Sequence, residues 1–251
     1  MDKFLKIDEV MIPTNGREVY IKGYMPNDEQ KHPAIIMSHG YNGCHEDFKN
    51  ECMYFAKNGF VAYALDFCGG STRSKSTGKS TDMTIFTEKE DLLAVFDYVS
   101  TMENVDPEQI YIFGGSQGGL VTAMAAEERA DKVKGLALYF PAFNISDNWR
   151  GNYKTEAEIP ETVDFWGLML GKNFFVSMRD YYSFESLGKF SKEVLIVQGD
   201  KDDIVPLSVA QRVEQLYSNA ELVVLPGEAH GFTPVAAKKA MEEVLKFMQD
   251  K

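Results

Sequence analysis

Residues 111–121 read YIFGGSQGGLV, and this stretch is the strongest indication of the fold. A short apolar run ends at one pair of glycines, and Ser116 stands with a glutamine between that pair and a second pair. The apolar run is typical of a strand buried on both faces, and the residues after the glycines have a helical pattern. A strand-to-helix turn this tight leaves no room for a Cβ at its flanks, which explains the glycines. It also lifts the Ser116 hydroxyl above the end of the sheet, beside the free N–H groups of a helix N-terminus.

The rest of the chain repeats the alternation of strand and helix. Runs typical of buried strands lie at 18–25, 34–40, 60–67, 109–115, 133–140, 193–200 and 220–226. Helical patterns lie at 46–58, 88–101, 117–129, 207–217 and 235–249. This order predicts an α/β fold with a mostly parallel, doubly wound sheet. The opening runs, about 3–12 and 18–25, have no helix between them and predict an antiparallel hairpin at one sheet edge.

Residues 142–190 interrupt the alternation. A structureless loop of that length is improbable inside a compact domain, so we expect a small cap inserted into a single domain that spans 1–251. Both tryptophans of the chain, Trp149 and Trp166, belong to this segment. We expect most of its aromatic residues to form the cap's own core, and we select Trp149, Trp166 and Tyr182 as substrate-binding residues.

Composition excludes several classes of partner. The formal net charge of the 251 residues is −12, and the sequence has no basic cluster long enough to follow a row of phosphates. Both facts argue against nucleic acid and anionic membranes as partners. No apolar stretch reaches the roughly 18 residues of a membrane span. The charged start, MDKFLKIDEV, has no signal-peptide pattern, so we expect a cytoplasmic protein. Three cysteines in a chain of this length do not indicate a disulfide framework, and a homodimer is one assembly that the sequence leaves open.

A serine nucleophile needs a base, and the base needs an acid that orients it. His230 is the single histidine after Ser116 and lies in GEAHGF, between the last strand and the last helix. The loop after the strand at 193–200 reads QGDKDDIVP and contains three aspartates. Its spacing to the following Val-Pro pair selects Asp202 as the acid and leaves Asp203 as the alternative. All of these loops are expected at the carboxyl end of the sheet, where Ser116 is expected.

An oxyanion hole needs two backbone N–H groups that point at the developing negative charge. One is expected from Gln117, directly after the nucleophile. The other is expected from Tyr41 in the loop HGYNG, where Gly40 lets the backbone approach. His39 in the same loop is expected to be a buried structural residue that holds the loop.

Together these motifs resemble the α/β-hydrolase superfamily, and most of all its bacterial cinnamoyl/feruloyl esterase group of serine esterases. The resemblance covers nearly the whole chain and rests on HGYNG, GGSQGG, the inserted segment, GDKDDIVP and GEAHGF. It implies Ser116, Asp202 and His230 as a catalytic triad, with the amides of Tyr41 and Gln117 as oxyanion donors. It also implies a small-molecule ester substrate with a hydroxycinnamoyl or other aromatic acyl group, and no cofactor and no metal.

Two departures from that group concern the substrate. Gly115 precedes the nucleophile where esterases of the group often carry histidine, and the strand at 60–67 is followed by DFCGGS instead of the usual D-x-x-G-H-G-x-S. The alternatives are therefore an amide or peptide hydrolase or acyltransferase of the same fold, and a ligand-binding homologue without activity. The segment GGSTRSKSTGKST at 69–81 resembles a phosphate-binding loop only in part, because Arg73 stands where that motif requires glycine.

Overall fold

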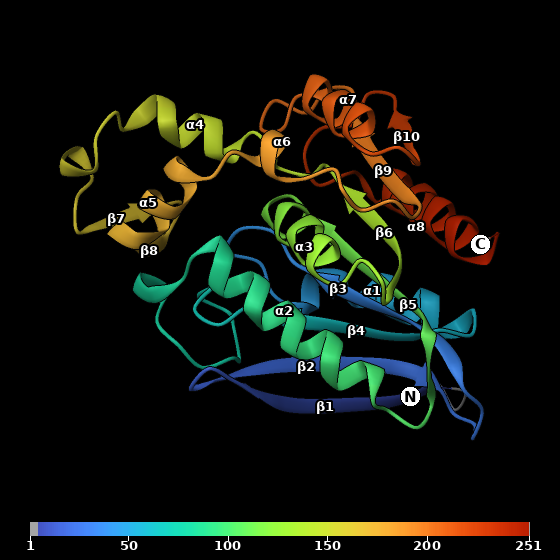
Figure 1. The fold of residues 1–251 in the computed structure, drawn as a ribbon. Helices are drawn as coiled ribbons and strands as arrows, with labels where there is room; N and C mark the ends of the chain where they lie inside the picture. The colour runs from blue at the N-terminus through green and yellow to red at the C-terminus, as the bar shows by residue number, and fades with distance from the viewer. Residues whose placement is uncertain (1–4, 251) are drawn as a thin grey trace.

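An eight-stranded sheet crosses the described residues, 5–250, of this computed structural model (Figure 1). Its strand order is β1-β2-β4-β3-β5-β6-β9-β10. The strands from β4 to β10 are parallel, whereas β2 is antiparallel to both β1 and β4. The predicted edge hairpin is thus confirmed for β1 and β2, and residues 3 and 4 of the predicted first run lie outside the described part. The strands are β1 (Leu5–Thr14), β2 (Arg17–Pro26), β3 (His32–Ser38), β4 (Val61–Asp66), β5 (Val105–Gly115), β6 (Val133–Tyr139), β9 (Val194–Gly199) and β10 (Ala220–Leu225).

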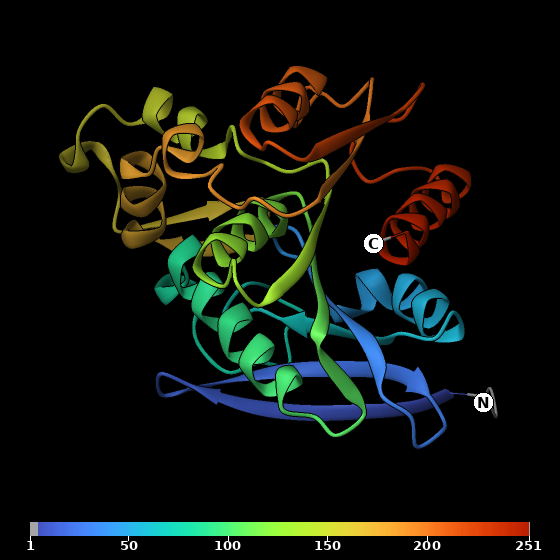
Figure 2. The same cartoon turned by 45° about the vertical axis from the view of Figure 1, so that its right-hand side comes forward.

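Helices cover both faces of the sheet (Figure 2). One apolar core lies between the sheet and α2, α3 and α7, and a second lies between the sheet and α1 and α8. Strand β3 contributes side chains to both cores, because Ile36 belongs to the first core and Ile35 and Met37 belong to the second. Burial on both faces explains the continuous apolar runs in the sequence. The helices are α1 (Lys49–Lys57), α2 (Ile85–Ser100), α3 (Gln117–Glu128), α7 (Leu207–Leu216) and α8 (Pro234–Gln249).

Two helix starts differ from the prediction for local reasons. Helix α2 begins at Ile85, before the predicted 88, because Thr84 caps it: the Thr84 hydroxyl accepts from the Thr87 N–H, and the Thr87 hydroxyl accepts from the Thr84 N–H. The pattern predicted as one helix at 46–58 is a short 3-10 helix, η1 (His45–Phe48), followed by α1. Gly59 has a φ of 89°, as expected for a glycine that ends a helix.

The inserted segment 142–190 has secondary structure of its own and lies beside the N-terminal end of α2 (Figure 1). Its buried centre contains Trp149, Phe174 and Phe175. A two-residue turn, Trp166 and Gly167, joins its two strands, and both residues have positive φ as a tight hairpin requires. Its elements are α4 (Ile145–Asn152), the 3-10 helix η3 (Glu156–Glu158), β7 (Thr162–Phe165), β8 (Leu168–Gly171), α5 (Lys172–Asp180) and α6 (Ser183–Ser186).

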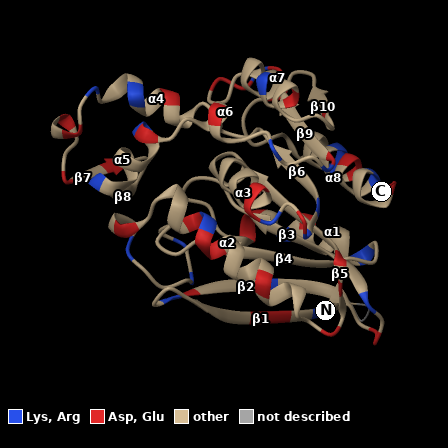
Figure 3. Ribbon diagram, viewed as in Figure 1, with Lys and Arg blue, Asp and Glu red and all other residues tan. Residues whose placement is uncertain are grey.

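The distribution of charged residues, the helices and the cysteines can be compared with what the composition indicated. Acidic and basic residues are interspersed on α2, α7 and α8 (Figure 3). Within residues 5–250, none of the helices has both the length and the apolar character needed to cross a bilayer. The three cysteines are buried free thiols.

Candidate active site

Ser116 lies at the sharp turn between β5 and α3, with a φ of 54° and a ψ of −122°. This backbone conformation is strained for a residue with a side chain, and the surroundings hold it in place. The Ser116 N–H donates to the Tyr139 carbonyl at 2.9 Å. A Cβ on Gly114 would strike the Gly118 carbonyl, and a Cβ on Gly118 would strike the His39 carbonyl. The glycines on either side are therefore required by the close packing of strand, helix and neighbouring loop.

Three side chains from separate loops form a continuous hydrogen-bonded chain. His230 Nε2 lies 3.0 Å from Ser116 Oγ, and His230 Nδ1 lies 2.7 Å from Asp202 Oδ2. His230 follows β10, and Asp202 follows β9, so both reach the carboxyl end of the sheet beside the serine. The ring of Phe140 packs against the imidazole with 4.5 Å between ring centroids. Ser116, His230 and Asp202 thus lie in the contact order that a nucleophile, a base and an acid have in a catalytic triad.

The Asp202 carboxylate is held from several sides. Its Oδ1 accepts from the N–H groups of Ile204 at 3.0 Å and Val205 at 2.8 Å, and its Oδ2 accepts from Gln198 Nε2 at 3.1 Å. The side chain of Asp202 is fully buried. Asp203, the alternative acid, is exposed and lines a neighbouring cavity instead of contacting the histidine.

The loop after β3 approaches Ser116 where an oxyanion hole is expected. A Cβ on Gly40 would lie 3.1 Å from Ser116 Cβ, so the absence of a side chain allows this approach. Gln117 is the first residue of α3, and its N–H therefore has no acceptor inside the helix. The phenol of the other predicted donor, Tyr41, donates to the Phe165 carbonyl at 2.6 Å. This bond links the loop after β3 to the β7–β8 hairpin of the inserted segment.

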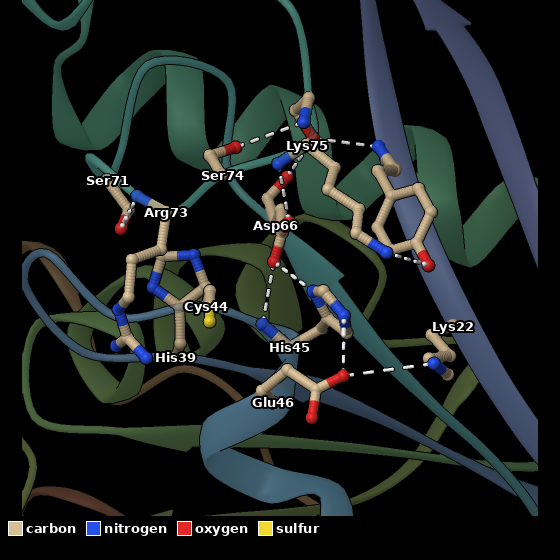
Figure 4. Close-up of polar contacts among 12 residues, drawn as sticks. Lys22, His39, Cys44, His45, Glu46, Asp66, Ser71, Arg73, Ser74 and Lys75 are labelled. Carbon is tan, nitrogen blue, oxygen red and sulfur yellow. Dashed lines mark hydrogen bonds and ion pairs between the residues drawn. The ribbon is translucent and has the colours of Figure 1, made fainter.

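Buried polar contacts behind this loop fix its position (Figure 4). His39 is buried, as predicted, and its Nε2 accepts from the Phe67 N–H at 3.1 Å. Asp66, at the end of β4, accepts from the His45 N–H at 2.6 Å, from His45 Nδ1 at 2.8 Å and from the Lys75 N–H at 2.8 Å. Burial alone would raise the pKa of Asp66, but these hydrogen bonds outweigh it and lower the pKa below its usual value.

The same region gathers three types of metal ligand. Ligand atoms of Cys44, His45 and Asp66 lie within 4.8 Å of one another, and all three residues are buried. Burial raises the pKa of the Cys44 thiol, which disfavours the thiolate that a metal would bind. Both oxygens of Asp66 already accept N–H donors, and a metal would have to displace the bond from His45 Nδ1. The arrangement is best described as a hydrogen-bonded anchor for two loops.

A cavity of about 340 Å³ opens beside Ser116, under the inserted segment. Trp149 and Trp166 line it, together with Phe165, so its wall is aromatic. The sequence patterns did not predict Phe165 or the polar side of the cavity. That side is formed by three residues spaced four apart, the first directly before α4 and the other two within it, a spacing that could have revealed them; they are Asn144, Asn148 and Asn152.

The structure does not bring Tyr182, which was predicted to bind substrate, to this cavity. The residue is 51% exposed and is not among those that line the cavity. The Arg150 guanidinium lies over its ring, 4.0 Å from the centroid. Arg150 is itself held by the carbonyls of Arg179 and Tyr181, so this cluster belongs to the outside of the inserted segment.

Comparisons with known proteins place the chain in a family. The model of the prolyl oligopeptidase family matches residues 46–251. The chain belongs to this family. Among solved structures of the fold, Est1E from Butyrivibrio proteoclasticus with bound ferulic acid has a TM-score of 0.87 at 29% identity, over 96% of this chain and 100% of that one. The α/β-hydrolase fold and the resemblance to serine esterases are confirmed by these matches.

Curated relatives of this prolyl oligopeptidase family member include enzymes with different names. A bifunctional esterase/perhydrolase of Acinetobacter calcoaceticus, DCH, is 22% identical over 94% of this chain and 97% of its own length. An acylamino-acid-releasing enzyme of Oryza sativa is 24% identical over 82% of this chain but only 25% of its own length.

Proposed function

We propose that this protein is a carboxylic-ester hydrolase that works through an acyl-enzyme on Ser116. The observation that carries the proposal is the chain of contacts from Ser116 Oγ through His230 to the buried Asp202, next to a cavity that can take an acyl group. The prediction of a serine ester hydrolase from the sequence agrees with the esterase relative that matches nearly the full chain.

In the first half of the reaction, Ser116 Oγ attacks the ester carbonyl carbon while His230 Nε2 takes the hydroxyl proton. Asp202 keeps the proton on Nδ1, so that Nε2 is free to accept, and stabilises the imidazolium that forms. The backbone N–H groups of Tyr41 and Gln117 receive the oxyanion. When the C–O bond to the alcohol breaks, the imidazolium returns its proton to the leaving oxygen.

In the second half, a water molecule attacks the acyl-serine. His230 Nε2 accepts a proton from this water, and a second tetrahedral oxyanion forms on the same two N–H groups. Collapse of that intermediate breaks the acyl–Oγ bond, and His230 returns the proton to Ser116. The products are a carboxylic acid and an alcohol, and the enzyme is restored without a cofactor.

We propose an aromatic acyl group, of the hydroxycinnamoyl type, as the preferred substrate. Rings of Trp149, Phe165 and Trp166 line the cavity beside the nucleophile and suit a flat apolar group. The amides of Asn148 and Asn152 line the same cavity and offer hydrogen bonds to polar substituents on such a ring. The ferulic acid bound to Est1E, a structural relative at 29% identity, supports this choice.

Replacing Trp166 with alanine tests the acyl preference. Trp166 is 65% exposed and stacks on Phe165, so its loss should remove cavity wall without disturbing the core. We expect kcat/KM for a phenylpropenoyl ester to fall by roughly 2- to 12-fold relative to an acetyl ester, which corresponds to about 0.5–1.5 kcal/mol for one ring contact. Tyr182→Ala is the matched control, because this exposed ring lies outside the cavity. An unchanged ratio in Trp166→Ala would show that this wall does not select the acyl group.

An amide or peptide bond is the second candidate substrate. It is favoured by Gly115 before the nucleophile and by the rice acylamino-acid-releasing enzyme among the relatives. The test compares kcat/KM for a panel of p-nitrophenyl esters with kcat/KM for aminoacyl p-nitroanilides, with the released leaving group detected equally well in both assays. We expect a higher kcat/KM for the esters than for the anilides. A higher kcat/KM for the anilides would make an amide or peptide bond the first candidate substrate.

Labelling with a fluorophosphonate is the companion measurement. We expect stoichiometric modification of Ser116, because the reagent needs only an activated serine and an oxyanion hole. Absence of both labelling and turnover would favour the ligand-binding homologue without activity. The proposed partner is a small-molecule ester; the cytoplasmic location and the homodimer remain predictions from the sequence.

A further inference from the structure

A buried carboxyl group lies directly behind the predicted oxyanion hole. Glu88 is in the first turn of α2, and its side chain contacts the residue that follows the nucleophile: Gln117 Nε2 donates to Glu88 Oε2 at 2.9 Å. Glu88 is 1% exposed and Gln117 is 2% exposed. The two helices thus share one buried polar contact beneath the N-terminus of α3, where the Gln117 N–H is expected to meet the oxyanion.

This carboxyl group has no cation of its own among the described residues. The nearby guanidinium of Arg17 binds Asp91, one turn further along α2, at 2.9 Å. Burial, reinforced by the negative charge of Asp91, raises the pKa of Glu88 to about 8, although the hydrogen bond from Gln117 acts in the opposite direction. At neutral pH Glu88 is therefore mostly protonated and carries no charge.

The fold leaves space for the Glu88 carboxyl, although burying it costs free energy. A Cβ on Gly70, in the loop after β4, would lie 3.2 Å from Glu88 Oε1, so a larger residue would crowd the carboxyl. Neighbouring core positions on α2 are apolar, for example Ile85 and Leu92. A leucine at position 88 would avoid the cost of burying a carboxyl, but it would leave the Gln117 amide without its partner.

We propose that Glu88 is a positioning residue of the oxyanion hole: in its neutral form it holds the Gln117 side chain in place, and in its ionised form it opposes the oxyanion. The first effect follows from geometry, because a fixed Gln117 side chain fixes the peptide N–H at the start of α3. The second follows from charge, because a carboxylate behind the hole repels the negative charge of the tetrahedral intermediate in a region with little water. This inference rests on the proposed ester hydrolysis.

Among the titratable groups around Glu88, burial raises the pKa of the Tyr41 phenol, in the loop after β3, and of the Cys68 thiol, in the loop after β4, so neither ionises below about pH 10. Burial also raises the pKa of Asp91 on α2, but this carboxyl is ion-paired with Arg17 of β2. Helix α3 contributes the uncharged amide of Gln117.

The test compares kcat against pH for the wild type and for Glu88→Gln, with an uncharged soluble ester and with Ser116→Ala as the blank for spontaneous hydrolysis. If only the neutral form turns over, the wild-type kcat falls roughly 25-fold between about pH 7.5 and about pH 9.5, since the neutral fraction of a group with a pKa of about 8 falls by that factor. Glu88→Gln keeps a hydrogen-bonding side chain that cannot ionise, so this fall should be absent. A flat wild-type profile, or the same fall in Glu88→Gln, overturns the proposal.

Two further variants separate positioning from general stability. Glu88→Leu should lower kcat by about 10- to 100-fold with little change in KM, because it disturbs an interaction made in the transition state, and Glu88→Gln should restore kcat at neutral pH. Glu51→Gln removes another buried carboxyl whose pKa burial raises, but one on α1, and it should keep the wild-type pH profile. Unchanged kcat in Glu88→Leu would overturn the positioning role, and if that variant does not fold the two pH profiles still decide.

Thermal unfolding reports the ionisation of Glu88 without any substrate. The folded protein holds the Glu88 proton up to about pH 8, whereas the unfolded chain releases it near the ordinary value of 4.5. The stability from this group is therefore complete below about pH 4.5 and is lost as the pH rises towards 8. Glu88→Gln should show a smaller fall in Tm between these pH values than the wild type. If this difference appears but no ester is hydrolysed, the proposed function fails and the ionisation of Glu88 stands; equal Tm profiles overturn the inference alone.

Discussion

Replacing Ser116 with alanine is expected to lower kcat for ester hydrolysis by on the order of 10⁶, the loss seen when a triad loses its nucleophile. The reason is that the acyl-enzyme can no longer form, while the cavity and the oxyanion donors remain. The folded state should survive, because alanine keeps the Cβ and the backbone bond to the Tyr139 carbonyl. Initial rates with a p-nitrophenyl ester and the far-ultraviolet circular dichroism spectrum measure the two effects.

Ser100→Ala provides the control for this experiment. Ser100 ends α2, and its hydroxyl donates to the Asp97 carbonyl of its own helix, so activity should remain at the wild-type level. Retention of even a tenth of wild-type activity in Ser116→Ala would exclude Ser116 as the nucleophile.

The second large effect is expected from Asp202→Asn, which should lower kcat by roughly 10⁴. The carboxylate accepts the proton of His230 Nδ1, whereas an amide N–H would donate to that nitrogen and move the imidazole proton to Nε2. In that tautomer Nε2 cannot accept the proton of Ser116. Stability should also fall, because Asp202 accepts N–H donors from Ile204 and Val205. Steady-state kinetics at temperatures well below each Tm separates the catalytic loss from the structural one.

Asp203→Asn is the matched control, one position along the same loop. Asp203 is exposed and lines the cavity, so its change can alter KM while kcat stays close to wild type. A larger loss of kcat in Asp203→Asn than in Asp202→Asn would move the role of the acid to Asp203.

Much of the fold could be predicted from local sequence patterns. Strands buried on both faces have continuous apolar runs, and those runs located each parallel strand of the sheet to within a few residues. The glycines around Ser116 predicted the strand-to-helix turn, since a tight turn excludes side chains whatever surrounds it. The order of the serine, aspartate and histidine loops predicted that the candidate triad lies at the carboxyl end of the sheet, because the loops that follow parallel strands all lie at that end.

The choice of pocket residues depended on the tertiary structure. Composition indicated an aromatic inserted segment, but side-chain direction decides which rings meet the cavity. Trp149 and Trp166 line it, whereas Tyr182 lies under Arg150 on the outside. Helix start positions also shifted where a side-chain cap, such as Thr84, competed with the apolar pattern.

Local sequence patterns therefore predicted the α/β class, the turn that presents Ser116 and the loops that hold His230 and the aspartates. The three-dimensional structure was needed to show that Asp202 contacts His230, that Tyr41 bonds to Phe165 across 124 positions and that Glu88 lies behind Gln117. The two kinds of information differ in the distance along the chain over which they act. Periodicity and turn chemistry act between residues a few positions apart, whereas a hydrogen bond between distant segments depends on how the whole sheet twists and which helix packs beside which.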